Sequence, residues 1–204
     1  MIKRDSGFSM VETVVVVVII AIVLAFAIPQ ATTAMRDYRL HSDASAVASQ
    51  LNVARMRASS QYAPYRLVVN IAVGTYWMEK LCGLTTSTTD ANCTSAYQPR
   101  TTAQIEGGTQ YVGTKDKYAT CRPSSVSAYP GTIQGDLSPC PAPLYVYFNT
   151  RGSPVDNTGS PLGNGGAILY LSNTSNMVDA VVVSVGGSVT VYQWETSSST
   201  WSAR

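Results

Sequence analysis

The sequence predicts an α+β fold in which one long N-terminal helix, with a transmembrane first half, packs on an antiparallel β-sheet head. Three observations lead to this prediction. An almost uninterrupted apolar run covers residues 8–28. An amphipathic stretch of helical period follows over residues 29–62. Strand-like segments separated by turn residues then recur through residues 63–204, which predicts a β-rich globular head.

The size and charge of the chain limit the functions it can have. With 204 residues and 45% hydrophobic content, it can form one membrane helix and one globular domain of ordinary size. Only 13% of the residues are charged and the net charge is +2, so the composition does not indicate nucleic-acid binding. Many Ser, Thr, Gly, Tyr and Val residues favour a secreted β-rich domain over a helical cytosolic enzyme.

The apolar run has the length of a membrane-spanning helix. As a helix, residues 8–28 extend about 31 Å, enough for the hydrocarbon core of a bilayer. Lys3 and Arg4 precede the run, so the positive-inside tendency keeps the short leader in the cytoplasm and places the head outside. A plain signal anchor and a cleaved secretory signal are the alternatives. Glu12 argues against a cleaved signal, because a carboxylate at a bilayer centre costs about 2.5–3.5 kcal/mol and needs a partner.

The start of the run resembles a known family. It resembles the class III leader and N-terminal helix of type IV pilins and type II secretion pseudopilins through Gly7-Phe8-Ser9-Met10-Val11-Glu12, the aliphatic run and Pro29. The resemblance implies that a prepilin peptidase removes residues 1–7 by cutting between Gly7 and Phe8, and methylates the new amine of Phe8. It implies that Glu12 pairs with the terminal amine of a neighbouring subunit. It also implies a bend or a local loss of helix at Pro29.

The same resemblance implies a location and a set of partners. The protein is expected as a single-pass protein of the bacterial inner membrane with its head outside the cytoplasm, and then in a periplasmic pseudopilus or an extracellular pilus. The implied partners are other pilin or pseudopilin subunits, the prepilin peptidase, the inner-membrane assembly platform and membrane lipid.

The second half of the helix carries one apolar stripe. Its members recur at alternating steps of four and three residues: Leu40, Ala44, Val47, Leu51, Ala54 and Ala58. Charged residues lie mostly off this stripe: Arg36, Arg39, Asp43, Arg55 and Arg57. We interpret the basic ones as a solvated helix face, with phosphate binding as the alternative. The helix is expected to end near Gln61, before Pro64. His41, the single histidine, is assigned no role because no metal-ligand or triad partners stand at recognisable spacing.

The head is expected to contain several short strands. Residues 66–73 and 75–79 predict a hairpin that turns at Gly74. The stretch 83–110, rich in Thr, Ser and Gly, predicts a loop. Further strands are expected at residues 144–149, 167–172, 178–185 and 188–194. A two-residue turn at Gly186-Gly187 is expected to join the last two.

Parts of the head resemble the GspH/FimT/FimU group of minor pilins and pseudopilins. These are Phe148-Asn149-Thr150-Arg151-Gly152, the hairpin of residues 181–191 and the helix end of residues 51–58. The resemblance favours a minor pilin or pseudopilin, with a major pilin or a tip subunit for adhesion or DNA uptake as alternatives. Some FimT-type minor pilins are associated with DNA uptake through a basic motif after the final glycine turn. Here Gly187-Ser188-Val189-Thr190 carries no arginine, so DNA binding is not favoured.

Four cysteines lie downstream of the apolar run, and none forms a C-x-x-C pair: Cys82, Cys93, Cys121 and Cys140. In a secreted domain this favours structural disulfides over a zinc site. Three connectivities exist. The pairing Cys82–Cys93 and Cys121–Cys140 is preferred because short loops cost less closure entropy, and reduced thiols remain the alternative.

The sequence does not indicate an enzyme. It contains no GxSxG, HExxH or P-loop motif. Asp136, Asp156 and Asp179 could contribute to a hydrolytic or calcium site, but isolated acids of this kind are interpreted as solvated loop residues. No catalytic residue, metal ligand or cofactor is therefore assigned.

Overall fold

A single helix dominates the molecule. The computed structural model describes residues 9–70, 75–80, 105–111, 122–123, 125–130, 144–162, 165–172 and 177–204. Helix α1 runs over Met10–Ser60, preceded by Ser9 in an extended conformation. At its end the N–H of Gln61 donates to the carbonyl of Arg57, 2.9 Å away. The helix ends at Ser60, four residues before Pro64, whose ring disfavours helical geometry in the preceding residue.

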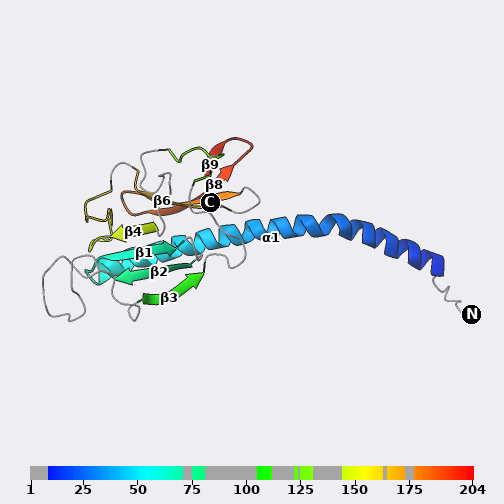
Figure 1. Cartoon of the computed structure of the whole chain (residues 1–204), viewed down its shortest axis with the longest axis horizontal. Helices are drawn as coiled ribbons and strands as arrows, with labels where there is room; N and C mark the ends of the chain where they lie inside the picture. The colour runs from blue at the N-terminus through cyan, green and yellow to red at the C-terminus, as the bar shows by residue number, and fades with distance from the viewer. Residues whose placement is uncertain are drawn as a thin grey trace, which may run out of the picture.

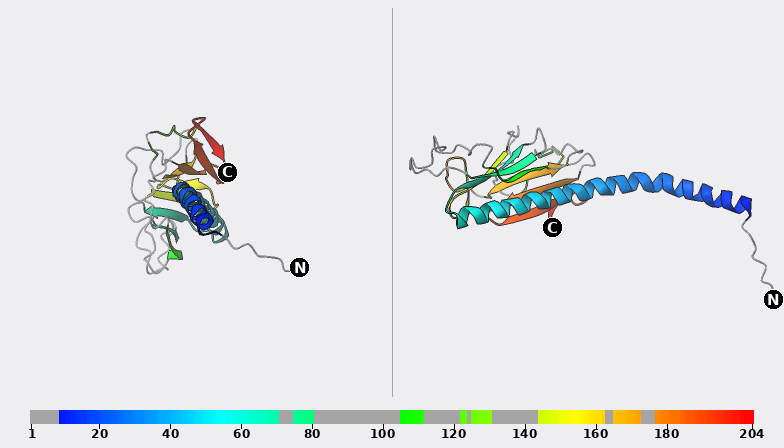
Figure 2. Two further views of the ribbon diagram at one scale, coloured as in Figure 1. Left: turned by 90° about the vertical axis from the view of Figure 1, so that its right-hand side faces the viewer. Right: turned by 90° about the horizontal axis from the view of Figure 1, so that it is seen from below.

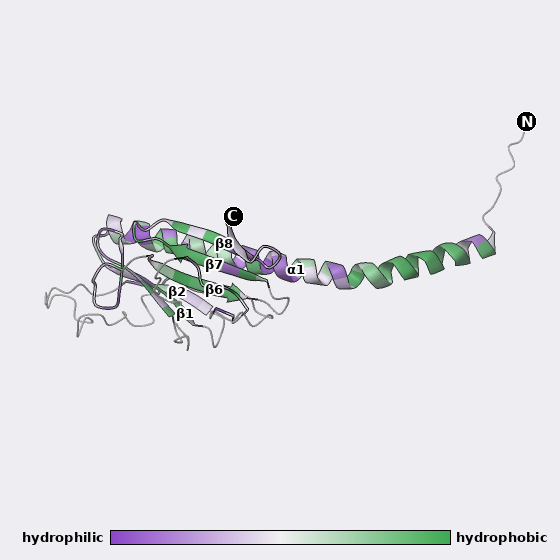
Figure 3. Ribbon diagram, turned by 90° about the horizontal axis from the view of Figure 1, so that it is seen from above, coloured by the Kyte–Doolittle hydropathy of each residue, from purple (hydrophilic) through white to green (hydrophobic). Residues whose placement is uncertain are grey.

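The head packs only on the C-terminal half of α1. Figure 1 shows the sheets gathered along that half, while the N-terminal half projects away from them. From Ser9 to Arg39 every residue is exposed except the partly exposed Asp37, and Leu40 is the first buried position. Figure 3 shows that the outer part of the projecting half is coloured hydrophobic almost throughout, whereas the part next to the head is paler or hydrophilic. The chain therefore leaves its most apolar segment without a packing partner among the described residues.

The strands nearest the end of α1 form an antiparallel sheet. Its strand order is β3-β2-β1-β4-β5. The bounds are β1 Tyr65–Asn70, β2 Thr75–Lys80, β3 Ile105–Tyr111, β4 Leu144–Phe148 and β5 Pro154–Val155. β1 lies centrally, with β2 on one side and β4 on the other. The antiparallel pairing of β1 with β2 confirms the two strands of the predicted first hairpin, whereas its expected turn at Gly74 lies outside the described residues.

The remaining strands form a second antiparallel sheet in sequence order. The bounds are β6 Ala167–Ser172, β7 Val178–Val183, β8 Val189–Glu195 and β9 Thr200–Ala203. Every residue of β6 and β7 is buried. Both strands are rich in branched aliphatic residues, which suit a sheet that is covered on both faces.

Both sheets pack on the apolar stripe of α1. Figure 2 shows them lying along the helix as a layer on its side. The six predicted stripe residues are all buried, and Ala48 joins them. The core brings this stripe together with inward side chains of both sheets, among them Leu67 of β1, Leu169 of β6 and Val181 of β7. The predicted α+β class, with a long helix on antiparallel sheets, is confirmed.

Some of the expected boundaries were wrong. All of β3 except Tyr111 lies within the stretch 83–110 that was expected to be a loop. Its sequence, Ile-Glu-Gly-Gly-Thr-Gln-Tyr, has few strand-forming residues, so pairing with β2 outweighs local propensity. The short strand β5 and the terminal strand β9 were also missed. β5 has only two residues, too few to show alternation.

Three of the described turns share one backbone geometry. In each, the first residue donates its N–H to the carbonyl four positions on, and accepts the N–H of a glycine three positions on. The turns span residues 149–153, 156–160 and 184–188, and their glycines Gly152, Gly159 and Gly187 have φ of 74°, 85° and 81°. This is the three-residue hairpin connection that ends in a glycine bulge. The expected two-residue turn at Gly186-Gly187 is therefore corrected to a three-residue one, with Gly187 in the left-handed position.

Candidate functional site

The projecting half of α1 is the most distinctive surface of the molecule. Within Met10–Ile28 the large hydrophobic side chains are 45–85% exposed. This segment is part of the one described helix that is long and apolar enough to cross a membrane. Exposed apolar surface of this extent is unstable in water, so it must be covered by lipid or by another protein surface.

Glu12 is the single ionisable residue between Ser9 and Met35. It lies in the first turn of α1, where the helix dipole favours a negative charge. Its side chain is exposed, and aliphatic residues follow Thr13 in an unbroken run to Ile20. A carboxylate in these surroundings can form a strong ion pair with a cation brought by another chain. Gly7 and Phe8 lie outside the described residues, so cleavage and methylation there stay predictions.

Pro29 lies inside α1, and the helix continues on both sides of it. The local loss of helix that was one of two expectations does not occur. Thr32 and Thr33 direct their hydroxyl groups to the carbonyl of Pro29, at 2.8 and 3.2 Å. Proline in a helix and threonine bonding back to the preceding turn both favour bending. Figure 1 shows that α1 is curved along its projecting part.

Arg55 hydrogen-bonds to the glycine turn of residues 184–188 and lies against the glycine turn of residues 149–153, which belongs to the other sheet. Its Nη1 donates to the carbonyl of Gly187 at 2.9 Å, and Nη2 to that of Gly186 at 3.3 Å. A Cβ at Gly152 would lie 3.0 Å from the Arg55 carbonyl, and a Cβ at Gly187 would lie 2.9 Å from Arg55 Nε. The interpretation of Arg55 as a solvated residue was therefore wrong: the two glycines make room for it.

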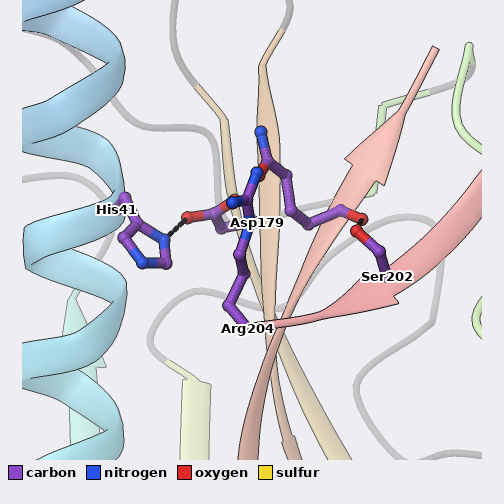
Figure 4. Close-up of polar contacts among 5 residues, drawn as sticks. His41, Asp179, Ser202 and Arg204 are labelled. Atoms are coloured by element: carbon purple, nitrogen blue, oxygen red, sulfur yellow. Dashed lines mark hydrogen bonds and ion pairs between the residues drawn. The ribbon is translucent and has the colours of Figure 1, made fainter. Parts of the chain in front are cut away.

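His41 and Asp179 form a second attachment, near the start of the packed half of α1. His41 Nδ1 lies 3.0 Å from Asp179 Oδ2, and Figure 4 shows the ring directed from α1 toward the carboxylate on β7. The Asp179 side chain is 0% exposed. Burial raises the pKa of Asp179 above its ordinary value of 3.8, whereas the hydrogen bond and charge of His41 lower that pKa. Asp179 was expected to be a solvated loop residue and His41 to have no role; both expectations were wrong.

The other expected site residues are only partly described. The four cysteines and Asp136 lie outside the described residues, so the disulfide prediction is not tested. Asp156 lies in an exposed turn, where its Oδ1 accepts from Thr158 and Ser160. One sequence signal could have revealed Asp179, because it stands alone inside the apolar run of residues 177–183. A single charge in a buried strand needs a partner.

One comparison with known proteins gives a match. Residues 2–28 match the family model described as "Prokaryotic N-terminal methylation motif". No curated protein and no solved structure matches the chain. The matched segment includes the exposed apolar part of α1 and Glu12, the same surface that the head leaves uncovered.

Proposed function

We propose, from the type IV pilin-like character that the methylation motif gives this chain, that it is a minor pilin or pseudopilin. It acts as a structural subunit of a type IV pilus or type II secretion pseudopilus. Before assembly, the projecting half of α1 resides in the inner membrane with the head outside the cytoplasm. After assembly, the same half packs among the helices of neighbouring subunits.

One observation carries this proposal: the matched motif extends over a helix half that packs against none of the other described residues and continues without a break into the head. The apolar surface of Met10–Ile28 requires two successive environments, lipid and then protein, and a separate projecting helix can enter both. α1 is helical throughout from Met10 into the head, so the projecting half of the helix determines where the head lies.

Processing at the leader is tested by mass spectrometry of the mature protein. We propose that the prepilin peptidase cuts between Gly7 and Phe8, so the mature chain starts at Phe8 and carries one added methyl group on its amine. A mature chain that starts near Ala31 would lack the anchor and would contradict the proposal.

Pairing by Glu12 is tested by filament incorporation. We propose that its carboxylate neutralises the terminal amine of a neighbouring subunit, because two opposite charges in an apolar environment are each costly alone. Glu12→Val should leave the protein in the membrane fraction but strongly reduce its amount in sheared filaments. Thr13→Val is the matched control, since it removes a neighbouring polar group and keeps the charge. Normal incorporation of Glu12→Val would refute the pairing.

The assignment as a minor subunit rests on the head. The turns at Gly152 and Gly187, which meet at Arg55, support the likeness to the GspH/FimT/FimU group. Quantitative mass spectrometry of purified filaments tests the assignment. We expect the protein at a small fraction of the most abundant subunit, whereas equal or greater abundance would make it the major subunit.

A further inference from the structure

The pair formed by His41 and Asp179 joins two parts of the chain that are 138 residues apart in sequence. His41 directly follows Leu40, the first buried residue of α1, so the pair lies where the helix enters the head. The side chain of His41 is 38% exposed, while that of Asp179 is fully buried. Water therefore reaches one partner and not the other.

The carboxylate of Asp179 is only half satisfied. Oδ2 meets His41, whereas Oδ1 is buried and has no hydrogen-bond partner among the described residues. A neutral carboxyl group tolerates this position better than a charged one, because an ionised oxygen without a donor loses all its hydration. The stability of this packing therefore depends on whether Asp179 is protonated.

Charged groups face Asp179 from two directions. From α1, His41 and Asp37 act on it, and Arg204 acts from the residue that follows β9. The neighbouring strands add no ionisable side chain at the paired positions, which are Leu171 of β6 and Gln193 of β8. Figure 4 shows Arg204 on the side of the carboxylate away from the helix, and the guanidinium of Arg204 donates to Gln193. The hydrogen bond of His41 goes to Oδ2 and that of Arg204 goes to Gln193, so neither residue brings a donor to Asp179 Oδ1.

We propose that His41 and Asp179 form a pH-responsive latch that holds the first packed turns of α1 on β7, and that ionisation of Asp179 loosens this latch. The opened state lets water reach Oδ1 and frees the start of the packed helix, residues 40–48, from the second sheet. The latch is a property of the folded head and does not depend on filament assembly.

The direction of the effect follows from the raised pKa of Asp179. The stability that neutral Asp179 contributes is fully present below pH 3.8, the pKa of the unfolded chain. It is lost as the pH rises through the higher pKa of the folded state. Above the pKa of folded Asp179, the equilibrium constant for opening should increase by up to about tenfold for each pH unit. His41 lowers the pKa of Asp179, so removing the imidazole should move the window to higher pH.

Hydrogen exchange on the full chain in detergent micelles tests the latch. Amide exchange is measured from pH 4 to pH 9 and corrected for the intrinsic rate at each pH. Protection of residues 40–48 should fall as the pH rises, while residues 54–58, held near Arg55, should keep theirs. Asp179→Asn should remove this pH dependence, because the amide cannot ionise.

Two further variants complete the test. His41→Gln keeps a hydrogen-bonding side chain without a charge, and should shift the loss of protection to higher pH. Glu195→Gln, which neutralises an exposed acid on β8, should behave like the wild type. Protection of residues 40–48 that is independent of pH in the wild type, or a pH dependence that persists in Asp179→Asn, would overturn the proposal. If Asp179→Asn does not fold, an unshifted profile in His41→Gln overturns it.

Discussion

The two halves of α1 differ in how they use apolar residues, although they belong to one helix. In the projecting half Leu24 is 50% exposed, whereas in the packed half Leu51 is 0% exposed. Residues 14–28 of the first half are apolar on all sides of the helix, whereas the second half is apolar along one stripe of small and medium residues. The apolar residues of the packed half therefore stabilise the head, while those of the projecting half are available to contact lipid or other protein chains.

The largest expected difference is between leucines of the two halves. Leu51→Ala should destabilise the head by about 2–5 kcal/mol, because it leaves a cavity among both sheets and the helix. Leu24→Ala should leave the stability of the head unchanged. Urea unfolding of both variants in detergent, followed by the fluorescence of the head tryptophans, measures the difference. Equal losses would mean that the projecting half also contributes to the fold.

The next effect concerns the two adjacent glycines of the β7–β8 turn. Gly187 has φ of 81° and lies against Arg55, so Gly187→Ala should cost about 1–3 kcal/mol. A Cβ at Gly186 would lie 3.9 Å from the Ser184 hydroxyl and would meet no other atom of the described residues within 4 Å, so Gly186→Ala should change little. The same urea assay distinguishes them. A similar cost at both glycines would contradict the described turn.

Loss of the Arg55 side chain should have a somewhat smaller effect. Arg55→Ala removes two hydrogen bonds to the β7–β8 turn and should cost on the order of 1–2 kcal/mol. Arg39→Ala removes an exposed arginine from the part of α1 before the head, and should cost nothing measurable. If both variants unfold at the same urea concentration, Arg55 does not attach the helix to the turns.

The smallest effect is expected at Asp156, in the turn of residues 156–160. The Thr158 hydroxyl, with the N–H groups of residues 158–160, lowers the pKa of Asp156 below its ordinary value of 3.8. The stabilisation it provides is present above pH 3.8 and is lost as the pH falls through the lowered pKa. NMR titration of the carboxyl group should therefore give a midpoint below 3.8. Thr158→Ala should raise that midpoint, and an unchanged value would exclude the hydroxyl as the main cause.

The parts of the fold that depend on local pattern could be predicted from the sequence. The stripe from Leu40 to Ala58 repeats at helical spacing, and the strands β6 to β8 are short apolar runs bounded by turn residues. β3 could not be predicted in this way, because its Gly107-Gly108 pair weakens any strand signal and its pairing with β2 is decided by the tertiary structure.

The residues of the candidate site also differ in whether the sequence reveals them. The motif around Glu12 is contiguous, so its spacing alone reveals it. The attachments of Arg55 and His41 reach partners more than 130 residues away. A charged residue on a helix gives no sign of which distant turn it will meet. Asp179 is the exception, because an acid between buried valines and alanine is itself a signal.

The continuity of α1 has a mechanical consequence. A helix of 51 residues is about 76 Å long, and the head holds it only along its second half. A pulling force applied to the head and resisted at Met10 would pass along the helix axis. The contacts at His41 and Arg55 would then be loaded in shear, parallel to the helix. The contacts along the packed half would have to break together before the head separated from α1.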